Sequence, residues 1–132
     1  MRKFKYSAII VFFSFIFSAF TACQNNEGIS SISAQEFKED WKDKQYTLLD
    51  VRSQGEFKEG YIKDAILIPV NSNDFKKKAL ELPKDKPIVI YCHAGPRANQ
   101  AASVLQQEGF KNIYLLDGSF SAWQDAGLPV EK

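Results

Sequence analysis

A cysteine followed by a short loop and a helix offers the clearest chemistry in the sequence. Cys92 comes directly after a run of apolar residues, and Arg97 stands five positions later, where a helical pattern begins. A thiol between a strand end and a helix N-terminus lies near about half a positive charge, and the amide N–H groups of a tight loop can converge on an anion. Cysteines in such settings have pKa values of about 3.5–7.5, against about 8.5 when free. The pattern therefore predicts a nucleophilic thiolate at Cys92.

The residues after Cys92 suit a loop that holds an anion. Gly95 permits a backbone conformation that other residues avoid, and Pro96 fits the first position of a helix. Arg97 adds a permanent positive charge. In the first helical turn this charge opposes the helix dipole, so we expect a compensating interaction. The predicted substrate-binding loop is formed by His93, Ala94, Gly95, Pro96 and Arg97.

Other roles for these residues follow from the sequence as well. A buried structural thiol is the alternative for Cys92, and a solvated side chain is the alternative for Arg97. His93 is the only histidine in the chain, but adjacent side chains on a curled loop usually point in different directions, so we do not expect it to deprotonate Cys92. One histidine and one free cysteine also give no case for a metal site.

Alternating strands and helices must position this loop. Short apolar runs predict five strands, at residues 29–32, 47–51, 65–69, 87–91 and 112–116. Helical patterns predict helices at residues 34–42, around 56–60, from 71–74 to about 82, at 97–108 and at 119–126. This order predicts an α/β domain with a mostly parallel five-stranded sheet and helices on both faces. Residues 87–91 are apolar throughout and are the predicted central strand.

Ligands in such sheets bind beyond the carboxyl ends of the strands. Among the segments that follow the predicted strands, only the one after residue 91 carries a nucleophile. Asp50 and Arg52 lie at the end of the second predicted strand. We expect a supporting role for both, through an internal salt bridge that holds the loops together.

The first residues have the features of an export signal. A basic start precedes an apolar run at residues 7–20, and small residues follow it, which is typical of a secretory signal peptide. A helix of about 14 apolar residues is roughly 21 Å long, shorter than the ~30 Å hydrocarbon core of a bilayer. We therefore expect residues 1–22 to be a cleaved signal peptide; an uncleaved anchor is the alternative.

Cys23 indicates lipid attachment. Together with the three residues before it, Cys23 resembles a bacterial lipobox, in which the cysteine is lipidated and becomes the mature N-terminus. Residues 23–28 are then the lipidated N-terminus and a flexible tether, and residues 29–132 are one domain of a periplasm-facing lipoprotein of the bacterial cell envelope. An ordinary signal peptide with an incidental cysteine is the alternative. If Cys23 carries lipid, Cys92 has no partner for a disulfide within the chain.

The charge balance argues against one class of partner. Residues 1–22 hold three of the 17 Lys and Arg residues and none of the 16 Asp and Glu residues. The remainder therefore carries a small net negative charge, and we do not expect nucleic-acid binding.

Three stretches in order resemble the rhodanese family. The first half contains LLDVR at residues 48–52, EF at 56–57, GYI at 60–62 and AILIP at 65–69, which look like the family's first signature. The loop from Cys92 to Arg97 has the Cys-x4-Arg spacing of the rhodanese active site. LDGS at 116–119, AW at 122–123 and AGLPV at 126–130 look like the C-terminal signature. The resemblance covers roughly residues 29–130 and identifies the chain as a member of the single-domain rhodaneses.

The resemblance implies a sulfurtransferase with a rhodanese-like fold. Cys92 would take sulfane sulfur from a donor such as thiosulfate or a persulfide and become a persulfide itself. It would then pass the sulfur to cyanide, a thiol or a protein acceptor, and the loop amides and Arg97 would stabilise the persulfide. No cofactor or metal is required. Because His93 is the only basic side chain inside the loop, a donor other than thiosulfate is compatible with the sequence.

Two positions depart from the family pattern, and other functions use the same loop. Tyr61 stands where His is usual and Asp64 where Gly is common, and both are expected to be structural. A non-enzymatic persulfide carrier or binding module would serve only a docked partner. A phosphatase or arsenate-reducing enzyme of this fold would need a Cys-x5-Arg loop, one residue longer. A role in redox defence would lack a resolving cysteine.

Overall fold

The computed structural model describes residues 28–132. The predicted signal peptide and Cys23 lie outside the described residues. Five strands and five helices alternate in the described part of the chain. In order they are β1 (Ile29–Ile32), α1 (Ala34–Asp40), β2 (Thr47–Asp50), α2 (Gln54–Glu59), β3 (Ile66–Leu67), α3 (Phe75–Ala79), β4 (Ile88–Tyr91), α4 (Pro96–Gln107), β5 (Ile113–Leu116) and α5 (Ser119–Asp125). Within residues 28–132, none of the helices combines the length and the apolar character needed to cross a membrane.

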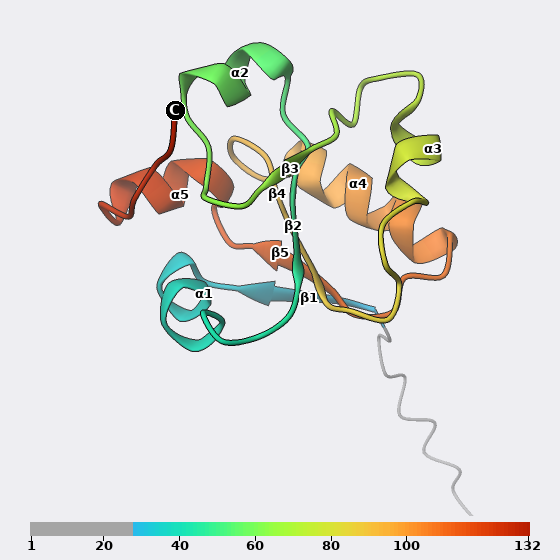
Figure 1. Cartoon of the computed structure of the whole chain (residues 1–132), viewed down its shortest axis with the longest axis horizontal. Coiled ribbons are helices and arrows are strands. Elements are labelled where there is room, and N and C mark those ends of the chain that lie inside the picture. Colours follow the sequence, from blue (N-terminus) through green and yellow to red (C-terminus); the bar gives the residue numbers. More distant parts are fainter. Residues whose placement is uncertain (1–27) are drawn as a thin grey trace, which may run out of the picture.

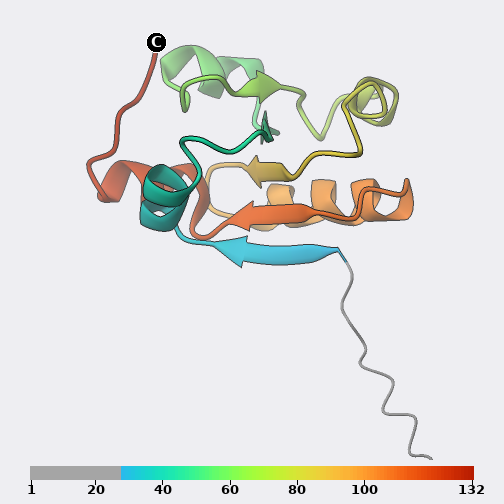
Figure 2. The same cartoon turned by 60° about the horizontal axis from the view of Figure 1, so that its bottom comes forward.

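The strands form one parallel sheet in the order β1-β5-β4-β2-β3 (Figures 1 and 2). The predicted fold class is therefore confirmed, with β4 in the middle. Because the strands are parallel, their carboxyl ends lie at the same edge of the sheet. An isolated antiparallel bridge between Tyr61 and Glu131 ties the end of the chain to the segment after α2.

The central strand is apolar on both faces because helices cover both faces. Ile88 and Ile90 pack with α3 and α4 on one face, whereas Val89 and Tyr91 pack with α1 and α5 on the other. All four side chains are 0% exposed. Figure 1 shows the two helix pairs on opposite sides of the sheet. The alternation follows from the two-residue period of a strand.

Helix α4 positions the Cys92 loop because it begins where the loop ends. Four of its side chains, at the positions i, i+3, i+4 and i+7 of one helical face, are buried against the sheet. They are Ala98, Ala101, Ala102 and Leu105. Three of the four are alanines, so the helix can lie close to the strands. Burial of the leucine alone contributes roughly 1.5–3 kcal/mol.

Two predicted elements are shorter in the structure. The strand expected at 65–69 is assigned over Ile66–Leu67 only, although the Ile68 and Val70 amides still donate to the Asp50 and Val51 carbonyls beyond it. The helix expected to end near residue 82 covers Phe75–Ala79. The residues on both sides form hydrogen-bonded turns, from the Ser72 amide to the Pro69 carbonyl before the helix and from the Leu82 amide to the Ala79 carbonyl after it.

The two residues that depart from the family pattern, Asp64 and Tyr61, have local roles in the fold. Asp64 has a φ of 66°, in the left-handed region that glycine favours and aspartate tolerates. The Tyr61 ring stacks on Phe57, with the ring centroids 4.1 Å apart. Both observations agree with the structural roles expected for these residues.

A left-handed turn connects β5 to α5. Gly118 has a φ of 67° and Ser119 a φ of 54°. A Cβ atom added to Gly118 would lie 2.5 Å from the Cβ of Ala122. Glycine is therefore required at residue 118 for its conformation and for the space around it, and this turn places Ser119 at the buried start of α5.

The turn predicts different costs for two glycine substitutions. Gly118→Ala should lower the free energy of unfolding by about 2–4 kcal/mol, because left-handed strain adds to a steric clash. Gly127 has the same φ of 67°, but a Cβ atom added there would meet nothing within 4 Å, so Gly127→Ala should cost only about 1–2 kcal/mol. Urea unfolding of both variants measures the difference, and equal losses would contradict the proposed clash.

Candidate active site

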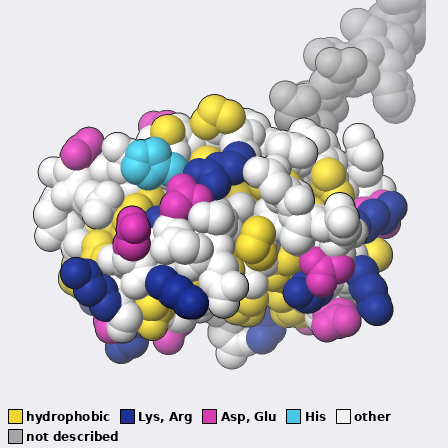
Figure 3. Space-filling view, turned by 90° about the horizontal axis from the view of Figure 1, so that it is seen from above, with side chains coloured by type: hydrophobic (Ala, Val, Ile, Leu, Met, Phe, Trp, Pro, Cys, Tyr) yellow, Lys and Arg dark blue, Asp and Glu magenta, His cyan; other side chains and the backbone are white. Residues whose placement is uncertain are grey.

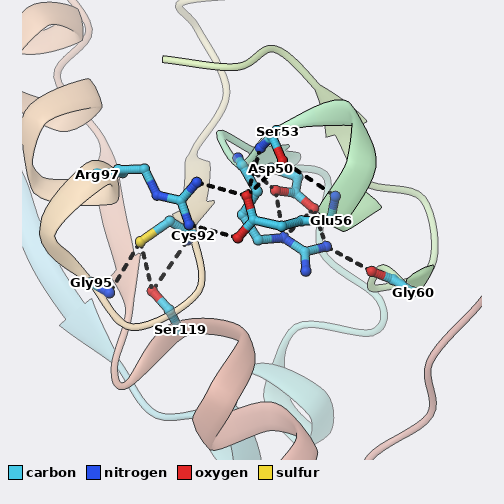
Figure 4. Close-up of polar contacts among 9 residues, drawn as sticks. Asp50, Ser53, Glu56, Gly60, Cys92, Gly95, Arg97 and Ser119 are labelled. Atoms are coloured by element: carbon cyan, nitrogen blue, oxygen red, sulfur yellow. Dashed lines mark hydrogen bonds and ion pairs between the residues drawn. The ribbon is translucent and has the colours of Figure 1, made fainter. Parts of the chain in front are cut away.

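Three segments meet around Cys92 at the carboxyl edge of the sheet (Figure 4). Cys92 follows the central strand β4, which lies between β2 and β5. The end of β2 supplies Asp50, the segment after it supplies Arg52, and the segment after β5 supplies Ser119. The sheet order therefore brings residues from distant parts of the sequence to the edge of the sheet that carries the thiol.

The Cys92 sulfur is buried and yet surrounded by hydrogen-bond donors. Cys92 is 1% exposed, and the Gly95 amide donates to its Sγ at 3.0 Å. Burial alone would raise the pKa of the thiol. The amides of Ala98, Gly95 and Ala94 and the Ser119 hydroxyl outweigh this effect, so the pKa of Cys92 lies below its ordinary value. The geometry thus favours a thiolate.

Glycine and proline shape the loop as expected from their backbone preferences. Gly95 has a φ of 129°, a conformation that residues with a Cβ rarely adopt. Helix α4 begins at Pro96, which confirms the predicted first helical position. The chain therefore curls tightly enough for the Gly95 amide to turn back toward the sulfur.

The first turn of helix α5 also holds the Cys92 loop in place, through two backbone hydrogen bonds. The Phe120 amide donates to the Cys92 carbonyl at 3.0 Å, and the Ser121 amide donates to the His93 carbonyl at 2.9 Å. The first amides of a helix lack partners inside the helix, so the loop carbonyls satisfy two of them. The position of the loop is consequently fixed by both α4 and α5.

Ser119 was not predicted as a site residue, although it is the last residue of the LDGS stretch at 116–119. Its hydroxyl oxygen accepts a hydrogen bond from the Cys92 amide at 3.2 Å and lies 3.8 Å from Sγ. Ser119 is completely buried. Its place three residues after the end of β5 was a usable signal, but only the order of the sheet shows that β5 is next to β4.

Arg97 lies beside Cys92 (Figure 4), but its guanidinium is bound to a carboxylate. Its Nη1 and Nη2 atoms each donate to a different oxygen of Glu56 at 2.8 Å. Hydrogen bonding to Glu56 raises the pKa of Arg97, and the charge of Cys92 adds to this. The pair is the compensating interaction expected for an arginine in the first helical turn, and its partner Glu56 was not predicted.

Glu56 is held in place by the start of its own helix. Its carboxylate accepts hydrogen bonds from the Ser53 amide at 3.0 Å and the Ser53 hydroxyl at 2.8 Å. The Glu56 amide donates in return to the Ser53 hydroxyl at 3.3 Å, which completes a capping box. The Arg97 guanidinium, helped by Ser53, holds the pKa of Glu56 well below its usual range despite partial burial.

Asp50 and Arg52 form the predicted internal salt bridge. Arg52 Nη2 lies 2.6 Å from Asp50 Oδ2, and the two side chains are 2% and 0% exposed. Arg52 also donates to the Gly60 carbonyl at 2.7 Å, and its guanidinium lies 4.0 Å from the centre of the Phe120 ring. The pair therefore joins β2, the end of α2 and α5 beneath the site.

Two hollows flank the Arg97–Glu56 pair. One has a volume of about 350 Å³ and is lined by Arg52, Glu56, Glu59, Gly60, His93, Phe120 and Gln124. The other has a volume of about 290 Å³ and is lined by Val51, Ser53, Gln54, Pro69, Asn71, Ser72 and Arg97. In the view from above, the histidine lies beside one acidic and one basic side chain (Figure 3).

The remaining loop residues lie at the surface. His93, Ala94 and Pro96 are exposed, so the side chain of His93 lines the first hollow while its carbonyl is held by α5. Among residues 28–132, no three His, Cys, Asp or Glu side chains are grouped so that they could hold a metal ion.

The contact between Ser119 and Cys92 predicts a change in thiol reactivity. Ser119→Ala removes one donor from the sulfur, so the pKa of Cys92 should rise and alkylation by iodoacetamide at pH 7 should slow by about threefold to tenfold. Ser121→Ala, on the same helix but without a contact to the sulfur, is the control. An unchanged rate for Ser119→Ala would show that the hydroxyl does not stabilise the thiolate.

The sequence and the fold match those of known proteins. The rhodanese-like domain family matches residues 33–126. A sulfurtransferase of Allochromatium vinosum is 37% identical over 83 residues, which are 63% of this chain and 76% of that protein. Thiosulfate sulfurtransferase GlpE of Shewanella oneidensis is 32% identical over 83 residues, or 63% of this chain and 80% of that protein. The crystal structure of a rhodanese-related protein from Thermoplasma volcanium has a TM-score of 0.68 and 35% identity, and the match covers 76% of this chain and 96% of that one. The chain therefore belongs to the rhodanese-like domain family.

Proposed function

We propose that this protein is a rhodanese-type sulfurtransferase that carries sulfane sulfur on Cys92. The observation that carries the proposal is the sulfur itself, which is buried but held by amide and hydroxyl donors that favour its anion. A thiolate in this setting is a nucleophile. The names of two similar proteins, a sulfurtransferase and a thiosulfate sulfurtransferase, support the same activity.

The proposed reaction has two halves. In the first, the Cys92 thiolate attacks the outer sulfur of the donor, and the S–S bond of the donor breaks. Sulfite or a thiolate leaves with the electron pair, and Cys92 becomes a persulfide. In the second half, cyanide or a thiolate attacks the outer sulfur of this persulfide, whose S–S bond breaks and returns the Cys92 thiolate. One sulfur atom is transferred without an external oxidant or reductant, so the reaction needs no cofactor.

The loop suits both halves because the charge moves only a short distance. When the persulfide forms, the negative charge shifts from Sγ to the outer sulfur, one S–S bond or about 2.05 Å away. The N-terminus of α4 favours negative charge across this distance. Because Cys92 is 1% exposed, the site must open before a donor can reach the sulfur.

A persulfide carrier that serves only a docked protein is a second candidate. The burial of Cys92 favours it, because a docked protein can hold the site open, whereas a small acceptor has few contacts with which to open it. The two functions differ in one measurable property: the carrier forms the persulfide but does not turn over with cyanide or small thiols.

We also propose that the protein is an exported lipoprotein anchored through Cys23 and facing the periplasm. The leader pattern and the lipobox-like residues before Cys23 support this proposal. Strand β1 begins at Ile29, so only residues 24–28 would separate the lipid-bearing cysteine from the domain.

Intact mass spectrometry tests the proposed activity. In a chain that carries Cys23→Ser, Cys92 is the only thiol. Thiosulfate, glutathione persulfide or polysulfide should add the mass of one sulfur atom, and cyanide should remove it as thiocyanate. The same chain with Cys92→Ser should gain nothing. A folded protein with a free thiol that gains no sulfur from any of the three donors would contradict the proposal.

Metabolic labelling tests the proposed anchor. In bacterial cells grown with radioactive palmitate, the wild-type chain should be labelled and should sediment with membranes. Cys23→Ser should abolish the label, whereas Cys92→Ser should keep it. Equal labelling of wild type and Cys23→Ser, or none in either, would contradict lipidation at Cys23.

A further inference from the structure

The two arginines near the site both have carboxylate partners. Arg52 is bound to Asp50 and to the Gly60 carbonyl, and Arg97 is bound through both terminal nitrogens to Glu56. Among the described residues that line the two hollows, the guanidinium groups are therefore already occupied. A donor that needs an arginine for its negative oxygens must compete with a carboxylate.

Arg97 is the arginine for which competition matters. Its side chain is 29% exposed and that of Glu56 is 33% exposed, so a dissolved anion can reach the pair. Arg52, at 2% exposed, is out of reach. Arg97 also interacts with the charge of Cys92, so it lies where it could bind the leaving group of a donor.

Glu56 competes well because its position is fixed independently of Arg97. The Ser53 amide and hydroxyl both hold its carboxylate, so little side-chain entropy is lost when Glu56 binds arginine. Its two oxygens face the guanidinium in the two-pronged arrangement that is strongest for such pairs. Glu56 thus presents to Arg97 the same chemical group that an oxyanion would present.

Two classes of sulfur donor differ in how much they lose when Glu56 occupies the Arg97 guanidinium. Thiosulfate carries three oxygens and two negative charges, and its sulfite leaving group takes both charges when the S–S bond breaks. A persulfide donor, R–S–SH, carries no oxygen on the transferred sulfur or on its neighbour; it transfers the outer sulfur to the Cys92 thiolate and leaves as the thiolate R–S⁻. The first donor gains from a free guanidinium, and the second does not depend on it.

We infer that Glu56 is a specificity-determining residue, which occupies Arg97 and so makes the site select persulfide donors over thiosulfate. The inference rests on the proposed sulfurtransferase activity and names its donor class. Glu59 lines the same hollow as Glu56 and adds a second negative charge on the approach of a dianion, but Glu56 is the carboxylate that engages the guanidinium.

The test is the ratio of two specificity constants. In the Cys23→Ser chain, kcat/KM is measured for thiosulfate and for 2-hydroxyethyl persulfide, whose carrier group is uncharged, with cyanide as the acceptor. Glu56→Gln keeps the size of the side chain and removes its charge. The ratio of thiosulfate to persulfide should rise by about fivefold, the upper range for a partly exposed ion pair.

Matched variants separate the effect of the Arg97–Glu56 ion pair from the effect of negative charge in general. Glu59→Gln removes one negative charge from the same hollow without freeing Arg97, and it should change the ratio by less than about twofold, as expected for a screened surface charge. In Arg97→Gln the rise caused by Glu56→Gln should disappear. If loss of the α2 cap unfolds Glu56→Gln, Glu56→Asp, whose shorter side chain weakens the two-pronged contact, should give a smaller rise of the same sign.

The outcomes distinguish the inference from the proposed function. If no donor produces thiocyanate or a Cys92 persulfide in the wild type, the proposed function fails first. If both donors work but Glu56→Gln leaves the ratio unchanged, Glu56 does not set donor choice and the inference is overturned. An equal rise for Glu59→Gln would overturn it as well, because general charge, rather than the occupied guanidinium, would then explain the selectivity.

Discussion

Burial raises the pKa of the Cys92 thiol and hydrogen bonding lowers it. The surrounding structure is arranged so that the effect of hydrogen bonding is the larger one. A buried thiol in apolar surroundings would be a weak nucleophile. Cys92 is nearly as buried as the core residues of β4, yet the amides of the loop and of the first turn of α4 point toward its sulfur. These donors are directed at the sulfur by the curled loop, by the backbone conformation of Gly95 and by the hydrogen bonds from α5. A small change in the loop would therefore alter the charge of the sulfur before it altered the fold.

The two arginines near the sulfur, Arg52 and Arg97, are both paired with carboxylates. The two pairs differ in burial, and therefore one can support the fold while the other can respond to a substrate. The buried pair of Asp50 and Arg52 joins three elements beneath the site, and removal of one partner of such a pair typically costs about 3–5 kcal/mol. The pair of Arg97 and Glu56 is partly exposed and is worth far less to stability, so a substrate can compete for it. One ion pair thus holds the scaffold, and the other lies where donor choice can be decided.

The features that depend on a local pattern of residues could be predicted from the sequence. Residues 87–91 revealed the central strand because they are apolar on both faces, and the loop after them revealed the nucleophile because Gly95 and Pro96 have distinctive backbone preferences. The partners of the site were harder to find. Ser119 contacts Cys92 across 27 positions of sequence and Glu56 contacts Arg97 across 41, and both contacts depend on the order of the sheet, which strand patterns do not encode. The strand β3 was overestimated because the apolar run at 65–69 does not show how many of its residues pair with β2.

The charge state of Cys92 is the central claim, and titration of the thiolate by its ultraviolet absorbance tests it most directly. The measurement compares the Cys23→Ser chain in the folded state and in denaturant, with the Cys23→Ser, Cys92→Ser chain subtracted as the background. The donors around the sulfur predict that the thiolate appears at lower pH in the folded protein than in the unfolded chain. A thiolate that appears at higher pH on folding would show that burial dominates, and it would contradict the account of the loop as an anion cradle.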